Sequence, residues 1–311
     1  MKRLLTIGLL FSLAFLTYPS AGKAVSAATP LKTFVSVLPL KYFVERVGGR
    51  RVAVQVMVGP GRSPATYEPT PKQMAALSRT QLYFRVGVPF ETVWMKRVAD
   101  LNPTMAIIDL RQGLKLRPLK HHHHDAKKGN QEIEHRGHEQ EQKTISQETD
   151  PHLWTDPNLV KQMTEQIRIT LTAADPAGAA DYQAGAEAFI HDLDDLDRTI
   201  RQKLANVTER RFLVFHPSWG YFAAAYDLQQ VAIEASGKEP GPRTLAGIIE
   251  QAKNNNISVI FVQQQFSRTT ATTIARAING QVVAIDPLAE DYLANMRRTA
   301  NAFARSLEES L

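Results

Sequence analysis

The sequence contains no cysteine among its 311 residues. This absence excludes disulfide bonds and thiolate metal ligands from the fold. It also leaves no thiol to carry a lipid at a processed amino terminus, so we expect a protein without a lipid anchor. Any metal site in this chain must use histidine, carboxylate or other oxygen ligands.

Long apolar runs are also missing, apart from one at the amino terminus. Lys2 and Arg3 precede the apolar run Leu4–Leu16, and the small residues Val25–Ala27 follow it. This order is typical of a secretory signal peptide, and the run is too short to span a bilayer. We therefore expect a signal peptide at 1–27 and a mature protein in the periplasm.

The chain also lacks the features of a nucleic-acid-binding protein. Its net charge is +6, but lysine and arginine are dispersed, and no basic helix or aromatic-interleaved basic patch occurs. We expect no nucleic-acid partner. The H-E-x-x-H signature of zinc proteases is absent as well, because His135 and His138 stand three residues apart in a polar, glycine-containing segment.

Histidine is concentrated in one polar segment, Lys120–His138, which contains six of the nine histidines of the chain. These are His121, His122, His123, His124, His135 and His138. The segment has too few apolar residues to form a core, and tracts of this composition commonly bind metal. Its histidines predict capture of Zn²⁺ or a similar ion. The alternative is a solvated insertion whose histidines are incidental.

Strands alternate with helices in two series, which predicts an α/β fold with mainly parallel sheets. The expected strands are 33–38, 52–58, 82–86 and 105–109, and then 211–215, 231–234, 259–262 and 282–285. A long amphipathic helix between the two series is expected to act as a rigid strut. The sequence thus predicts a signal peptide at 1–27, an N-terminal lobe at 28–174 with a histidine-rich loop at 120–143, a linking helix at 175–206 and a C-terminal lobe at 207–311.

Three residues with metal-ligand side chains lie beside the predicted strands. His216 follows the strand at 211–215, Asp286 follows the strand at 282–285, and His152 lies in a proline-rich loop. Ligands of open α/β sheets bind outside the carboxyl ends of the strands, and two imidazoles with a carboxylate suit Zn²⁺, or Mn²⁺ with more oxygen donors. Singly, each residue has an ordinary explanation as an exposed loop histidine or a helix-starting Asp-Pro.

Several blocks of the chain, in order, resemble one family over nearly the whole mature sequence. They are GRSPATYEPTPKQMAAL, VGVPFE, DPHLWTDP, FHPSWGYFAAAYDL, EASGKEPGP and VVAIDPLAEDY. The family is that of the periplasmic zinc- and manganese-binding proteins of bacterial ABC importers, known as cluster A-I. The resemblance implies two small α/β lobes bridged by one long rigid helix, with the metal in the cleft between them.

The resemblance also implies the ligands His152, His216 and Asp286, and it reveals one departure. Where the family has a further histidine, in an S-P-H-x-Y-E-P block, this chain has Ala65. Alanine offers no donor atom, which leaves one position of the metal shell open. Water, Glu68 or a histidine of the 121–138 segment could complete the shell, or the cleft could bind metal poorly.

The expected function is therefore extracytoplasmic binding of a divalent transition metal, Zn²⁺ before Mn²⁺, and its delivery to an ABC permease and its ATPase in the inner membrane. We expect a monomer and no enzymatic activity. The alternatives are a metal-buffering or adhesion protein of the same fold, and a zinc hydrolase that would need a base such as Glu68.

Overall fold

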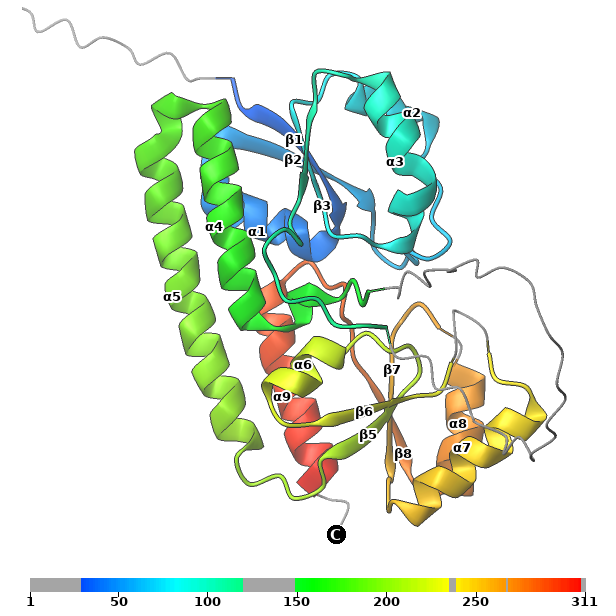
Figure 1. Ribbon diagram of the computed structural model, residues 1–311. Helices are drawn as coiled ribbons and strands as arrows, with labels where there is room; N and C mark the ends of the chain where they lie inside the picture. Colours follow the sequence, from blue (N-terminus) through cyan, green and yellow to red (C-terminus); the bar gives the residue numbers. More distant parts are fainter. Residues whose placement is uncertain (1–28, 120–148, 235–238, 267, 309–311) are drawn as a thin grey trace, which may run out of the picture.

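The computed structural model describes residues 29–119, 149–234, 239–266 and 268–308 (Figure 1). The predicted signal peptide at 1–27 and the histidine-rich loop at 120–143 lie outside these residues. Within the part that is described, no helix is both long and apolar enough to cross a membrane. Two α/β lobes with parallel sheets and one long helix beside both confirm the predicted fold class (Figure 1).

The first lobe is built on a four-stranded parallel sheet of order β2-β1-β3-β4. Its strands are β1 (Leu31–Val37), β2 (Val52–Val58), β3 (Leu82–Arg85) and β4 (Ala106–Asp109). Its helices are α1 (Leu38–Gly48), α2 (Pro71–Leu77) and α3 (Pro89–Leu101), with a 3-10 turn η1 (Gly49–Arg51) after α1. Helix α2 begins at Pro71 because the Thr70 hydroxyl accepts from the backbone N–H of Gln73 and Pro71 occupies the first turn.

The second lobe repeats this order with a sheet β6-β5-β7-β8, again all parallel. Its strands are β5 (Arg211–Val214), β6 (Gln229–Ala232), β7 (Val259–Val262) and β8 (Gln281–Ala284). Its helices are α6 (Gly220–Ala225), α7 (Pro242–Asn254), α8 (Arg268–Ala277) and α9 (Tyr292–Glu308). In each sheet the second strand in chain order lies on one side of the first strand, and the third and fourth lie on the other side. Ligands of such sheets bind outside the carboxyl ends of the strands at this switch, so these ends are the expected binding edge of each lobe.

Three segments connect the lobes: η2 (Leu153–Thr155), α4 (Pro157–Ala174) and α5 (Ala179–Leu204), with a 3-10 turn η3 (Pro176–Gly178) before α5. Helix α5 is continuous over 26 residues and runs beside both lobes (Figure 1). The apolar face expected from its spacing is buried. Gly185, which weakens the helix on propensity alone, has a packing reason, because a Cβ there would lie 2.5 Å from the carbonyl oxygen of Val47 in α1.

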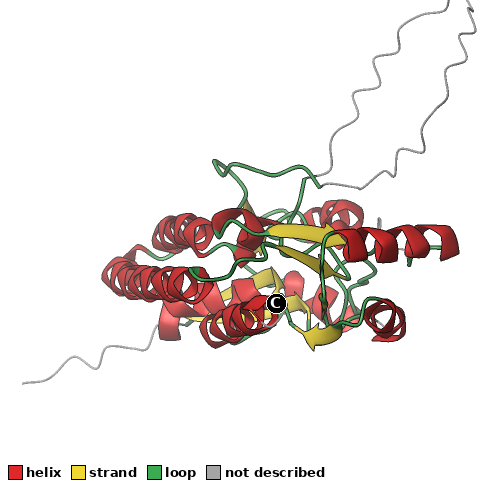
Figure 2. Cartoon of the chain, turned by 90° about the horizontal axis from the view of Figure 1, so that it is seen from below, coloured by secondary structure: helices red, strands yellow, loops and turns green. Residues whose placement is uncertain are grey.

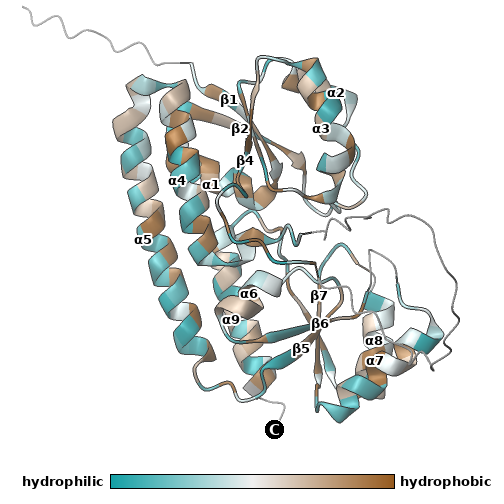
Figure 3. Cartoon of the chain, viewed as in Figure 1, coloured by the Kyte–Doolittle hydropathy of each residue, from teal (hydrophilic) through white to brown (hydrophobic). Residues whose placement is uncertain are grey.

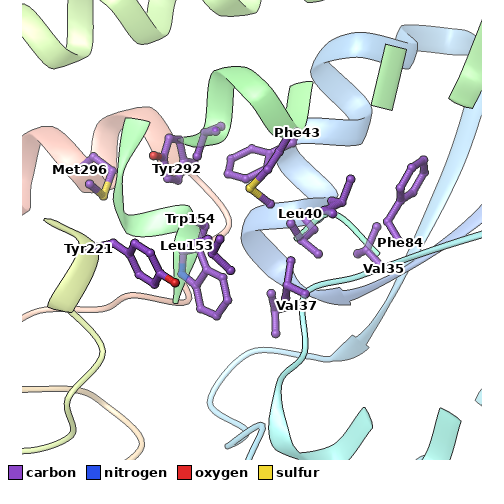
Figure 4. Packing of buried hydrophobic residues seen from close by; sticks show 14 of the residues in the cluster. Val35, Val37, Leu40, Phe43, Phe84, Leu153, Trp154, Tyr221, Tyr292 and Met296 are labelled. Carbon is purple, nitrogen blue, oxygen red and sulfur yellow. The ribbon is translucent and has the colours of Figure 1, made fainter. Parts of the chain in front are cut away.

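One hydrophobic core runs from the first lobe into the second, and a smaller cluster lies within the second lobe against α7 and α8. Helices flank the strands (Figure 2), and the strands are coloured largely as hydrophobic whereas the helices alternate between hydrophobic and hydrophilic residues (Figure 3). On α9, Phe303 packs against Phe212 and Phe261, whereas Tyr292 at its other end packs against Phe43 of α1. Figure 4 shows Trp154 within this core, between the lobes. A shared apolar core opposes independent motion of the lobes, because opening them would expose it to water.

Candidate metal centre

His216 is placed by the carboxyl edge of the second sheet. It follows β5, and its backbone N–H donates to Gln263 Oε1 at 3.2 Å, while Gln263 Nε2 donates to the His216 carbonyl oxygen at 2.6 Å. Gln263 directly follows β7, the neighbouring strand, and is buried. The ring of Phe266 stacks on the imidazole with centroids 5.1 Å apart. These contacts fix the direction in which the His216 side chain leaves the sheet.

His152 is placed by a short turn between β4 and α4. Its backbone N–H donates to Asp150 Oδ1 at 3.0 Å, and its ring atom Nδ1 lies 2.7 Å from the same oxygen. The Tyr221 hydroxyl of α6 donates to the Asp150 carbonyl oxygen and accepts from the Arg117 amide, which ties this turn to the second lobe. Burial lowers the pKa of His152 below its usual value of 6.5, although the Asp150 carboxylate acts in the opposite direction.

The structure brings the two histidines together. Their ring centroids are 5.2 Å apart at an interplanar angle of 75°. Each Nδ1 is bonded to a buried carboxylate, that of Asp150 for His152 and that of Glu234, at 2.5 Å, for His216. In the neutral form of each ring, a carboxylate that accepts the Nδ1 proton leaves the lone pair on Nε2, which is then the atom available to a metal ion.

Asp150 and Glu234 were not among the residues predicted from the sequence. Asp150 stands two residues before His152, and Glu234 lies just past the end of β6, at the same sheet edge as His216. Their positions at strand and turn ends were a usable signal, but their roles depend on the side-chain directions that only the fold defines. Carboxylate–histidine pairs of this kind are typical of the shell that orients metal ligands.

A cavity of about 90 Å³ lies beside the two imidazoles. Ala65, Val88, Phe266 and Leu288 contribute apolar groups to its wall. The loop that carries Ala65 is held in place by the Phe90 N–H, which donates to the Pro64 carbonyl oxygen at 3.1 Å. Ala65, which stands where the resembling family has a histidine, thus lines the same cavity as His152 and His216. The donor set, two imidazole nitrogens in a mostly apolar hollow, is of the type that suits a borderline ion such as Zn²⁺.

The structure leaves the remaining predicted ligands open. The Asp286 carboxylate accepts from the Leu288 N–H at 2.9 Å, and the two residues after Asp286 line the cavity. Among the described residues, no group of three or more His, Asp or Glu is arranged to hold one ion, so the role of Asp286 stays a prediction. Glu68 is exposed and lines a separate hollow with Tyr67 and Gln73. His121, His122, His123, His124, His135 and His138 lie outside the described residues.

His191 does not line this cavity. It lies on α5 with 75% of its side chain exposed, and Nδ1 is 3.9 Å from an Asp195 oxygen. Trp154 and Trp219 are both buried. Trp154 packs against His152 with ring centroids 5.3 Å apart, and its indole N–H donates to the Pro287 carbonyl oxygen at 2.7 Å. That bond joins the turn of His152 to the loop after β8.

Comparisons with known proteins point to one family. The family model described as "ZnuA: Zinc-uptake complex component A periplasmic" matches residues 34–306. A crystal structure of ZnuA superimposes with a TM-score of 0.79 at 34% identity, covering 90% of this chain and 100% of that one.

Two sequence relatives differ in the metal of their names. The zinc-binding lipoprotein AdcA of Streptococcus pneumoniae is 24% identical over 97% of this chain and 60% of its own length. The manganese-binding lipoprotein MntA of Halalkalibacterium halodurans is 25% identical over 90% of this chain and 89% of its own. This chain thus spans about 60% of AdcA. Because both relatives are named lipoproteins, the expected absence of a lipid anchor stays a prediction.

Proposed function

The chain belongs to the ZnuA family of periplasmic metal-binding proteins of ABC importers, and from this premise we propose that it binds zinc between its lobes and delivers the ion to a membrane permease. Members of this family are metal-binding transport proteins rather than enzymes. The observation that carries the proposal is the convergence of His152 and His216, with ring centroids 5.2 Å apart and both Nδ1 atoms engaged.

Zinc is the proposed cargo because of the ligand type. Two imidazole nitrogens suit Zn²⁺ better than Mn²⁺, which prefers a shell richer in oxygen. The two carboxylates behind the histidines also offset the charge of a divalent ion in a buried place. Manganese stays the second choice, since a relative of similar identity is named for it.

In the proposed site His152, His216 and Asp286 hold the ion. Asp286 would release the Leu288 N–H and turn its carboxylate into the cavity that Leu288 itself lines. Because the lobes share one core, we propose that binding orders loops such as this one and does not swing the lobes apart. Release follows docking on the permease, and acid favours it, since a histidine must be neutral to bind metal.

A calorimetric zinc titration tests this proposal. The proteins are the chain without its predicted signal peptide, a version that also lacks residues 121–138, and His216→Ala and His191→Ala variants of that shorter version. His191→Ala is the matched control, because it removes an exposed imidazole remote from the cavity. We expect one zinc site to survive the deletion and His191→Ala, and to be lost with His216→Ala. Loss of all binding on deletion of 121–138 alone would contradict the proposal.

Ala65 favours a second candidate function, metal buffering or adhesion without transport. A site short of one ligand binds its ion more weakly, and a weak site suits storage better than capture at low metal concentration. Growth in zinc-limited medium separates the two functions. A strain that lacks its own importer-binding protein should regain growth with this chain if the chain delivers zinc, and should not if the chain only buffers it.

A further inference from the structure

A second pocket lies against Asp150 and includes neither of the two imidazoles. The segment 117–119 lines it from one side, and residues of α6 and β6 line it from the second lobe. Its volume is about 280 Å³. This is close to the lower limit of about 300 Å³ for small-molecule sites in proteins, so the pocket has room for a small ligand. Leu119 lines both this pocket and the cavity of the histidines, so the two are neighbours.

One oxygen of the Asp150 carboxylate has no protein donor. Oδ1 accepts from the main-chain N–H of His152 and is also bonded to the ring atom Nδ1 of that residue. Oδ2 forms no hydrogen bond within the part of the chain that the structure describes, although Asp150 is only 4% exposed. It lies beside Gly220 in the pocket, where a Cβ on that glycine would be 2.7 Å away. Because burying a carboxylate oxygen without a donor is costly, Oδ2 favours a ligand that brings a cationic donor.

Two donors stand close to this oxygen. The Trp219 N–H donates to Gln230 Oε1 at 2.8 Å, and this bond fixes the amide so that Nε2 is its free end. Nε2 lies 3.7 Å, and Arg117 Nε 3.9 Å, from the position of the Gly220 Cβ. The Arg117 guanidinium lies over the Tyr221 ring, 5.9 Å from its centroid, and forms no ion pair with a described carboxylate. A guanidinium and an amide together favour a carboxylate group of the ligand.

The remaining wall of the pocket is largely apolar. Leu119 and Leu228 face it, together with Ala223, Ala224 and the prolines of the lining. An aliphatic group placed against these side chains would leave water, which favours binding. The matching ligand therefore carries a cation, an anion and an aliphatic group close to one another.

We propose that this pocket binds a free α-amino acid with an aliphatic side chain, such as leucine. The ammonium group donates to Asp150 Oδ2, and the carboxylate accepts from Arg117 and Gln230 Nε2. The aliphatic side chain lies against Leu119 and Leu228. This solute site goes beyond the proposed function, and it does not need a metal ion.

Calorimetry on the metal-free chain without its predicted signal peptide tests the ligand class. The probes are leucine, 4-methylpentanoate, which lacks the ammonium group, and 3-methylbutylamine, which lacks the carboxylate. Leucine should bind about tenfold or more tightly than either analogue, because each analogue loses a charge-assisted hydrogen bond. Absence of leucine binding, or equal affinities for the three compounds, would overturn the inference.

A pair of variants tests the position of the site. Arg117→Met removes the charge and keeps much of the apolar stem, whereas Arg210→Met makes the same change before β5, away from the pocket lining. Arg117→Met should weaken leucine binding about tenfold, and Arg210→Met should change it by less than about twofold. Equal affinities of the two variants would overturn the assignment. If Arg117→Met does not fold, the analogue series on the unmodified chain still decides the ligand class.

NMR of the histidine rings supplies a second readout. The Asp150 carboxylate also holds the His152 ring, so leucine should shift the ring resonances of His152. His191 is the control, because it is 75% exposed on α5 and should not respond. Leucine binding that leaves His152 unshifted, or shifts both rings equally, would overturn the placement of the ammonium group on Asp150.

Discussion

Replacing Glu234 with glutamine should weaken zinc binding about 10- to 100-fold, although the side chain does not touch the ion. The Glu234 carboxylate is 2% exposed and lies 2.5 Å from Nδ1 of His216. Its negative charge lies behind a proposed ligand of a divalent cation, and its hydrogen bond to Nδ1 fixes the tautomer that leaves Nε2 free. Glutamine has nearly the same shape, so the change removes the charge and leaves the packing.

The expected loss corresponds to about 1.4 to 2.7 kcal/mol of binding free energy, at about 1.4 kcal/mol for each tenfold change. A loss of this size is reasonable for a pair that is largely shielded from water, since His216 itself is only 25% exposed. An exposed pair would contribute less, because solvent screens it.

The assay is a competition titration with zinc, carried out on Glu234→Gln and on Glu209→Gln. Glu209 is the matched control, because it undergoes the same chemical change in the same lobe but bonds Arg211 at the opposite end of β5. Urea denaturation of both metal-free variants separates affinity from stability. Zinc affinity of Glu234→Gln within about twofold of the unmodified chain would refute the role of this carboxylate.

Three further predictions follow from the geometry. Gly220→Ala places a Cβ 2.7 Å from Asp150 Oδ2, so it should displace this carboxylate from His152 and lower zinc affinity about tenfold in the same titration; unchanged affinity would contradict the coupling. Gly87→Ala forces φ +80° on a residue with a side chain and puts its Cβ 2.1 Å from Arg111 Nη1, so urea denaturation should show a loss of about 1–3 kcal/mol, and an unchanged midpoint would refute it. Burial lowers the pKa of His152, so the metal-free folded protein keeps this ring neutral where the unfolded chain takes up a proton. The contribution of His152 to the free energy of unfolding should therefore be complete above about pH 6.5 and should decline as the pH falls below that value. An NMR titration that finds the ring protonated at or above about pH 6.5 would disprove this.

Most of the fold could be predicted from local patterns. The bounds of β2 and β7 match the predicted ranges, because β-branched runs fix them locally. Helix α6 begins only at Gly220, three residues after Pro217, because the Ser218 N–H first closes a turn on the His216 carbonyl oxygen. Such turns depend on contacts between neighbouring strands that a local pattern does not contain.

The sequence by itself determined the kinds of ligand available, the two α/β series and the long helix that joins them, because the absence of cysteine, the apolar periodicity and the order of strands are all local properties of the chain. Only the tertiary structure decided that His152 and His216 face each other, that Asp150 and Glu234 bond to their Nδ1 atoms, and that Ala65 lines the same cavity. These residues come from loops and strand ends far apart in the sequence. Their distances are set by the shared core and by the meeting of the two sheet edges, which no local pattern specifies.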